Sequence, residues 1–71
     1  MDREQVESDS ISSIGYEPGS ETLEIEFKHG GIYRYFGVPR GDHQKLMSAS
    51  SKGAAFHEII RARSYPFSKV K

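Results

Sequence analysis

The chain has 71 residues, a formal net charge of zero and no cysteine. A chain of this length forms one domain with a small hydrophobic core, and the lack of cysteine excludes both disulfides and thiolate metal sites. No segment has the pattern of a signal peptide or is apolar over the length of a bilayer span. We therefore expect a cytoplasmic protein with no membrane partner.

The zero net charge hides a strong segregation of charge along the chain. Residues 1–27 contain eight acidic residues and one basic residue, and residues 28–71 contain nine basic and two acidic residues, so the two parts carry net charges of −7 and +7. A basic part of this kind is typical of a surface that binds a polyanion. Solvated surface charge is the simpler interpretation, and attraction between acidic and basic surfaces, within one molecule or between two copies, is another.

The predicted fold begins after a polar N-terminus. Residues 1–9 are acidic and have almost no apolar anchors, which predicts disorder. Residues 10–16 are rich in β-formers and precede a Pro-Gly turn, so they predict a first strand. In residues 22–28 apolar and polar residues alternate without a fault, which predicts a second strand with one apolar face.

The turn after this strand decides which face of the sheet carries two tyrosines. With a three-residue loop that ends at Gly30, this glycine takes a positive φ, and the third strand places Tyr33 and Tyr35 on the apolar face. A two-residue loop shifts the register by one residue and sends both tyrosines to the opposite face. We favour the longer loop, because glycine at its third position has a steric reason to be there. Arg34 then faces outward beside Glu24.

Two helices are predicted after the third strand, which ends at Pro39. A short helix begins near Asp42, which is its candidate N-cap, and ends near Ala49. Ser51 is a candidate N-cap for a second helix over residues 52–62, whose apolar residues recur at helical spacing. The end of the chain, SYPFSKVK, has two aromatic residues that could pack back on the sheet, and residues 66–71 within it form a basic tail. The sequence thus predicts an α+β fold (βββαα), a three-stranded antiparallel sheet covered on one face by two short helices.

Four short motifs carry a resemblance to a known family. In chain order they are TLEIEF, GGIYRYFGVP, SASSKGAAF and IRARSY. The chain resembles the KTSC domain, a short module found at the C-terminus of some lysyl-tRNA synthetases and as stand-alone bacterial and phage proteins. The resemblance covers residues 10–65, and its Tyr-x-Tyr signature falls on Tyr33 and Tyr35. Through the association with tRNA synthetases it implies a nucleic-acid partner, RNA in preference to DNA.

The third strand is the first candidate site. Aromatic side chains interleaved with a cation, here Tyr33, Arg34 and Tyr35, are typical of sheets on which the bases of single-stranded RNA stack. Packing of both tyrosines in the core is the alternative, and it agrees with the favoured register. Phe36 is then the exposed aromatic residue and a candidate contact in its own right.

The start of the second helix is the second candidate site. If Ser51 caps the helix, the free backbone amides of Lys52, Gly53 and Ala54 suit a phosphate, and glycine lets the phosphate approach closely. A plain capped helix is the alternative, because every helix N-terminus has such amides. The candidate phosphate contacts are Arg34, Arg40, Lys52, Arg61 and Arg63.

No pattern in the sequence predicts catalysis, a metal site or a cofactor. The three histidines lie in three different elements, and no serine has the sequence context of a nucleophile. We therefore predict a non-enzymatic binding module that contacts nucleic acid. With five phosphate contacts on a single strand, the logarithm of the binding constant falls with the logarithm of the salt concentration with a slope of about −3.5. The alternative is a protein-interaction module that uses complementary acidic and basic surfaces.

Overall fold

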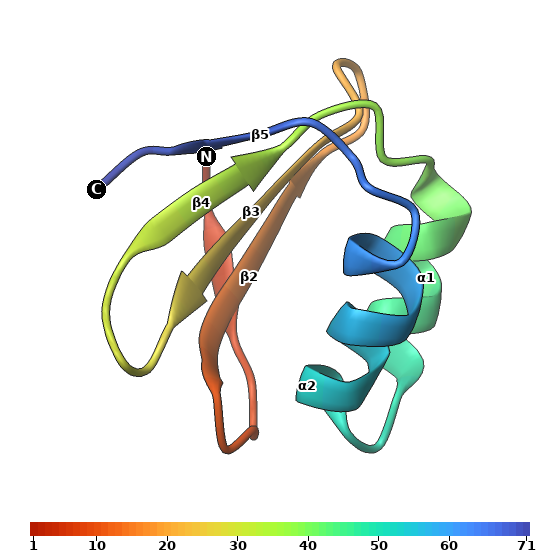
Figure 1. The fold of residues 1–71 in the computed structure, drawn as a ribbon. Helices are drawn as coiled ribbons and strands as arrows, with labels where there is room; N and C mark the ends of the chain where they lie inside the picture. Colours follow the sequence, from red (N-terminus) through yellow and green to blue (C-terminus); the bar gives the residue numbers. More distant parts are fainter.

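A computed structural model describes all residues from Met1 to Lys71 as one antiparallel sheet with helices on one face (Figure 1). The strands are β1 (Arg3–Gln5), β2 (Ile11–Glu17), β3 (Thr22–Phe27), β4 (Ile32–Tyr35) and β5 (Phe67–Lys69). The helices are α1 (Arg40–Ser48), α2 (Lys52–Ala55) and the π-helix η1 (Phe56–Arg61), which continues α2. The strand order is β1-β2-β3-β4-β5. The α+β class and the antiparallel sheet are confirmed, but the sheet has five strands and the predicted number of three is wrong.

The first extra strand, β1, lies in the segment that was predicted to be disordered. Its residues pair antiparallel with Ser13 to Gly15 of β2. The Arg3 side chain reaches across β2, where it donates a hydrogen bond to Ser13 (2.9 Å) and binds the carboxylate of Glu24. The prediction weighed only the lack of apolar anchors in this segment. Backbone pairing and a bound arginine order it instead.

The second extra strand, β5, lies in the basic tail. Phe67 pairs with Tyr35, and Lys69 pairs with Tyr33. The Phe67 ring packs on Tyr35 with a centroid distance of 5.6 Å, which confirms that the tail packs back on the sheet through this residue. A strand of three residues is too short to show an alternating pattern, so only its place beside β4 defines it.

The hairpin between β3 and β4 has the favoured register. Gly30 has a φ of 114° and its N–H donates to the carbonyl of Phe27 (3.1 Å), which closes the three-residue loop. Tyr33 therefore lies opposite Ile25, and Tyr35 lies opposite Leu23. Both tyrosines are on the face of the sheet that the helices cover.

The core fills the space between this face and the helices. Its ten buried residues are Ile11, Ile14, Leu23, Ile25, Tyr35, Val38, Leu46, Ala55, Phe56 and Ile60. An irregularity in the β2–β3 register between Ile11 and Ser13 lets both Ile11 and Ile14 face inward although they are three residues apart. Neither helical segment has the length and apolar character that a bilayer span requires.

The two helix starts differ from each other in their capping. The helix α1 begins at Arg40, directly after Pro39, and no side chain caps it. The prediction of Asp42 as N-cap is therefore wrong, because this carboxylate is buried and accepts a hydrogen bond from the Tyr65 hydroxyl (2.5 Å). The Ser51 cap is confirmed, since its hydroxyl accepts the N–H of Ala54 (3.3 Å).

Candidate functional site

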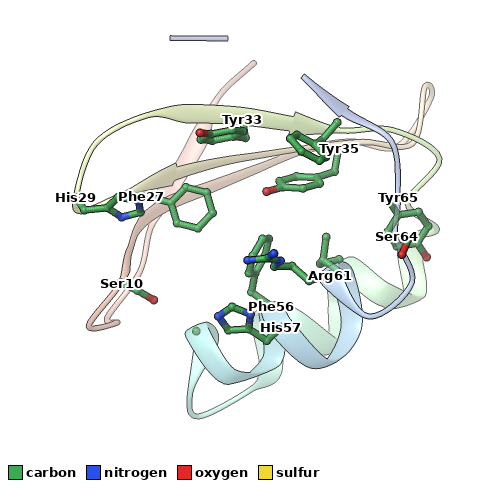
Figure 2. Close-up of a pocket in the computed structure, with 13 residues that line it drawn as sticks. Ser10, Phe27, His29, Tyr33, Tyr35, Phe56, His57, Arg61, Ser64 and Tyr65 are labelled. Atoms are coloured by element: carbon green, nitrogen blue, oxygen red, sulfur yellow. The ribbon is translucent and has the colours of Figure 1, made fainter. Parts of the chain in front are cut away.

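A cleft with a volume of about 570 Å³ opens between the sheet and the second helical segment. We call it the aromatic cleft. Its aromatic lining residues are Phe27, Tyr33, Tyr35, Phe56, Tyr65 and Phe67. Its polar side chains are Ser10, His29, His57, Arg61 and Ser64. In Figure 2 Tyr33 and Tyr35 line the cleft from the sheet, and Phe56, His57 and Arg61 rise from the helix below them.

Aromatic rings from both layers contact one another around the cleft. Phe56 of η1 packs edge-on against Phe27 and Tyr35, with centroid distances of 5.4 and 5.5 Å. Phe67 of β5 lies 6.1 Å from Tyr33 in a tilted arrangement. Contacts of this kind are favourable and hold the rings in place. A flat ring that enters the cleft therefore meets aromatic surfaces that are already positioned.

Two of the three tyrosine hydroxyls in the cleft, those of Tyr33 and Tyr35, are free for a ligand, whereas the Tyr65 hydroxyl is bonded to Asp42. Neither Tyr33 nor Tyr35 uses its hydroxyl in a hydrogen bond within the chain, and no buried side-chain polar atom lacks a partner, so both hydroxyls reach solvent. Burial raises the pKa of Tyr35 above its ordinary value, and the nearby Arg61 guanidinium opposes this effect only in part. The Tyr35 hydroxyl is therefore protonated at neutral pH and can donate a hydrogen bond.

The π-helix turns Arg61 toward the cleft. In a regular α-helix, residues five positions apart point about 140° away from each other. The π turn closes between residues five apart, as in the bond from the Ala62 N–H to the His57 carbonyl (3.1 Å). Phe56 and Arg61 consequently lie on the same side of the helix, and Figure 2 shows the guanidinium beside Phe56 and below Tyr35.

The fold and the cleft invite comparison with known proteins. The family model described as the KTSC domain matches residues 7–65. The chain belongs to the KTSC domain family. The predicted resemblance is therefore confirmed, and the Tyr-x-Tyr residues on which it rested, Tyr33 and Tyr35, both line the aromatic cleft of this KTSC domain.

Three similar proteins illustrate the contexts in which such domains occur. The crystal structure of a KTSC domain protein from Yersinia pestis has a TM-score of 0.94 and 43% sequence identity, with 99% of this chain and 97% of that chain covered. A protein of Stutzerimonas stutzeri is 36% identical over 70 residues, which is 99% of each chain. A lysine–tRNA ligase of a Nostoc species is 42% identical over 57 residues, which is 80% of this chain but 10% of the ligase.

The ten predicted site residues do not form one surface. Four of them, Tyr33, Tyr35, Gly53 and Arg61, line the aromatic cleft. Ser51, Lys52 and Gly53 line a second cavity of about 450 Å³. The other predicted residues, Arg34, Phe36, Arg40 and Arg63, line neither.

Arg34 lies on the sheet face opposite the cleft, as the register predicted. Its Nε donates to the Glu24 carboxylate at 2.7 Å, and Arg3 binds the same carboxylate. Burial by itself would raise the pKa of Glu24, but the hydrogen bonds from Arg34 and Arg3 outweigh burial and hold it below its ordinary value. Arg34 is thus occupied by a buried carboxylate and points away from the tyrosines.

The helix start at Ser51 is a poor place for a phosphate in this structure. The Lys52 ammonium donates to the Ala49 carbonyl (2.5 Å), and the Ser10 hydroxyl occupies the space above Gly53, where an added Cβ would lie 2.7 Å from it. Two acidic residues, Glu7 and Asp9, line the same cavity. These carboxylates offset the two lysines of the cavity, Lys28 and Lys52, and so weaken the positive field that the sequence predicted for this site.

The remaining predicted contacts are dispersed. Arg63 lies 3.5 Å from the buried carboxylate of Asp42. Arg40 is exposed at the first residue of α1. Phe36 is 40% exposed, which confirms that it is an exposed aromatic residue, although Phe67 beside the tyrosines is more exposed, at 62%. Arg61 is therefore the single predicted cation that the fold brings to the tyrosine pair.

The cleft also contains residues that the sequence did not single out as a site. Phe27 and Phe56 have the spacing of core residues, and Phe67 lies in the tail. The hairpin register is the one sequence signal that could have placed Phe27 near the tyrosines, since it puts all three on one face. No three or more His, Cys, Asp or Glu side chains are grouped in a way that could hold a metal ion.

Proposed function

We propose that this KTSC domain is a non-enzymatic binding module whose aromatic cleft takes single-stranded nucleic acid. The observation that supports the proposal is the meeting of Tyr33, Tyr35, Phe56 and Arg61 around one cavity of about 570 Å³. Every base has a face that can stack on an aromatic ring, and an arginine at the same place can bind a phosphate. A pocket of this volume lies within the range of small-ligand sites, which is about 300–1,000 Å³.

The proposal favours an unpaired strand of RNA. Bases in a duplex are stacked and paired, and only a splayed, single-stranded base can enter a cleft between two layers of protein. A similar domain forms part of lysine–tRNA ligases, whose name states that they act on tRNA. We extend this association to the present chain as part of the proposal. A cytoplasmic location follows from such a partner.

The experiment is an NMR titration of the isotopically labelled protein with short single-stranded RNA and DNA at low and moderate salt. We expect chemical-shift changes at Tyr33, Tyr35 and Arg61. Tyr33→Leu should weaken binding by about 5- to 150-fold, because stacking contributes about 1–3 kcal/mol per base. Phe36→Leu is the control, since this aromatic residue lies outside the cleft. Equal affinities of wild type and Tyr33→Leu, or no shifts even at low salt, would contradict the proposal.

A protein-interaction module is the second candidate. One observation favours it: of the ion pairs in the structure, Arg34–Glu24 alone joins the acidic N-terminal part to the basic C-terminal part. Most of the segregated charge therefore remains available for a partner. If copies of the chain associate in this way, sedimentation velocity should show a dimer at 10 mM salt that dissociates at 300 mM. A monomer under both conditions would exclude self-association.

A further inference from the structure

We infer that the aromatic cleft holds a single nucleotide unit, one base with one phosphate, and does not follow a length of strand. The inference rests on the function proposed above and specifies its ligand. Three observations carry it: where the aromatic surface ends, how few cations the cleft has, and which polar groups in it are free.

The aromatic surface ends with the cleft. The cavity next to it shares Ser10 and Gly53 with it but has no apolar residue in its lining, so it offers no face on which a second base could stack. The charged residues of that cavity balance, because Glu7 and Asp9 offset Lys28 and Lys52, so it offers a phosphate no excess of positive charge. A strand that left the cleft in this direction would lose stacking and would meet no excess of positive charge.

The cations in and near the cleft are too few for several phosphates. Arg61 is the one arginine or lysine among the lining residues. Lys69 is the next candidate, because it lies opposite Tyr33 across β4 and β5. Lys28 and Lys52 line the neighbouring cavity, where two carboxylates offset their charge. Arg34 and Arg63 are engaged with Glu24 and Asp42. One or two phosphate contacts give a log–log salt slope of about −0.7 to −1.4, compared with about −3.5 for five contacts.

The free polar groups of the cleft are suited to binding one nucleotide. The hydroxyls of Tyr33 and Tyr35 are unbonded within the chain and can bond to the edge or the sugar of a base that stacks between the layers. The Arg61 guanidinium extends toward the same space from the opposite layer (Figure 2) and can bind the phosphate of that unit. All three residues line the same cavity, which fits one ligand better than a series of repeated units.

The test compares ligands of increasing length. Adenosine and uridine, their 5′-monophosphates, and oligouridylates of two, four and eight residues are titrated into the whole chain and followed by NMR. We expect the monophosphates to shift Tyr33, Tyr35 and Arg61. When the oligouridylate is longer than two residues, the affinity divided by the number of nucleotides should change by less than about threefold. The logarithm of the binding constant should fall with the logarithm of the salt concentration with a slope between about −0.7 and −1.4.

A matched pair of variants tests the phosphate contact. Arg61 is exposed, so Arg61→Gln should fold normally. The substitution should lower the affinity for adenosine 5′-monophosphate by about three- to tenfold and leave the affinity for adenosine unchanged. Arg40→Gln removes one positive charge outside the cleft and should change the affinity for neither ligand. Equal binding of the monophosphate to wild type and Arg61→Gln would overturn the assigned contact.

The outcomes separate this inference from the proposed function. If the octamer binds with a slope near −3.5 while the monophosphates cause no shifts, the single-unit inference fails and nucleic-acid binding stands. If neither monomers nor oligomers bind, the proposed function fails as well. Saturable binding of the monophosphates at the cleft supports both.

Discussion

Glu24 shows how one residue connects the first four strands on the sheet face away from the helices. It is only 3% exposed, yet it lies on the polar face of β3. Arg3 from β1 and Arg34 from β4 bind its two carboxylate oxygens, and Ser13 of β2 bonds to both Arg3 and Glu26. A buried carboxylate is stable only with such partners. This polar network fixes the N-terminal strand to the rest of the sheet.

Glu24→Gln should destabilise the domain and alter its acid stability. At pH 7 we expect a loss of about 1.5–3 kcal/mol in the free energy of unfolding, the value of a hydrogen bond to a charged group. Because the pKa of Glu24 is below its ordinary value of 4.5, its contribution is present above pH 4.5 and is lost as the pH falls through the lower, folded-state pKa. Urea unfolding at pH 7 and pH 3 should therefore show a smaller difference between wild type and variant at pH 3.

Glu58→Gln provides the control for this measurement. Glu58 is exposed on η1 and forms no ion pair, so its replacement should leave both the stability at neutral pH and its pH dependence nearly unchanged. A difference between wild type and Glu24→Gln that is the same at both pH values would show that ionisation of Glu24 does not contribute.

Tyr65 connects the segment after η1 to α1 through one hydrogen bond. Its hydroxyl donates to Asp42, which is 5% exposed and has Arg63 as its other neighbour. Tyr65→Phe should reduce the free energy of unfolding by about 1.5–3 kcal/mol, because a buried carboxylate loses a donor. Tyr33→Phe removes a hydroxyl that has no partner within the chain and should change stability little. Equal effects of the two substitutions on urea unfolding would contradict this role of Tyr65.

At the scale of elements, β1 depends on a glycine in its neighbour. A Cβ at Gly15 of β2 would lie 2.6 Å from the backbone oxygen of Asp2, closer than Cβ atoms approach other heavy atoms in proteins. The two strands can pair only because this position has no side chain. The sequence pattern of β2, ISSIGYE, contains this glycine, but the reason for it lies in a segment that sequence reasoning left outside the fold.

Gly15→Ala should detach β1 or strain the β1–β2 pair, with a loss of about 1–3 kcal/mol. Amide hydrogen exchange at Arg3–Gln5 should accelerate in the variant. Gly41→Ala is the matched control, because nothing lies within 4 Å of a Cβ at this position in α1. It should stabilise the protein by about 0.5–1 kcal/mol through helix propensity. Unchanged exchange in β1 of Gly15→Ala would refute the steric argument.

For the whole molecule, the arrangement of strands predicts a gradient of local stability. β3 is central, with β2 and β4 on either side, whereas β5 is an edge strand whose three residues are all exposed, with Phe67 at 62%. Local opening is easiest where few buried contacts hold a segment. Native-state hydrogen exchange should therefore be slowest in β3 and fastest in β5 among the strands. Equal protection of β3 and β5 would indicate that the sheet opens only as a unit.

The sequence alone determined the features that depend on local patterns. Alternation in TLEIEF predicted β3, and glycine at position 30 predicted the three-residue loop that sets the register. That register placed Tyr33 and Tyr35 on the helix-facing side. Ser51 predicted the start of the second helix. Each of these signals acts over a few neighbouring residues, where sterics and capping are strong.

Only the tertiary structure decided which charges and rings meet. The strand β1 is held by Arg3 reaching a carboxylate 21 positions along the chain, and β5 is held by pairing with β4 across more than 30 residues. The π turn, which the helical spacing of the sequence does not predict, aimed Arg61 at the tyrosines. Long-range pairing and helix winding depend on the packed whole, so no short window of sequence specifies them.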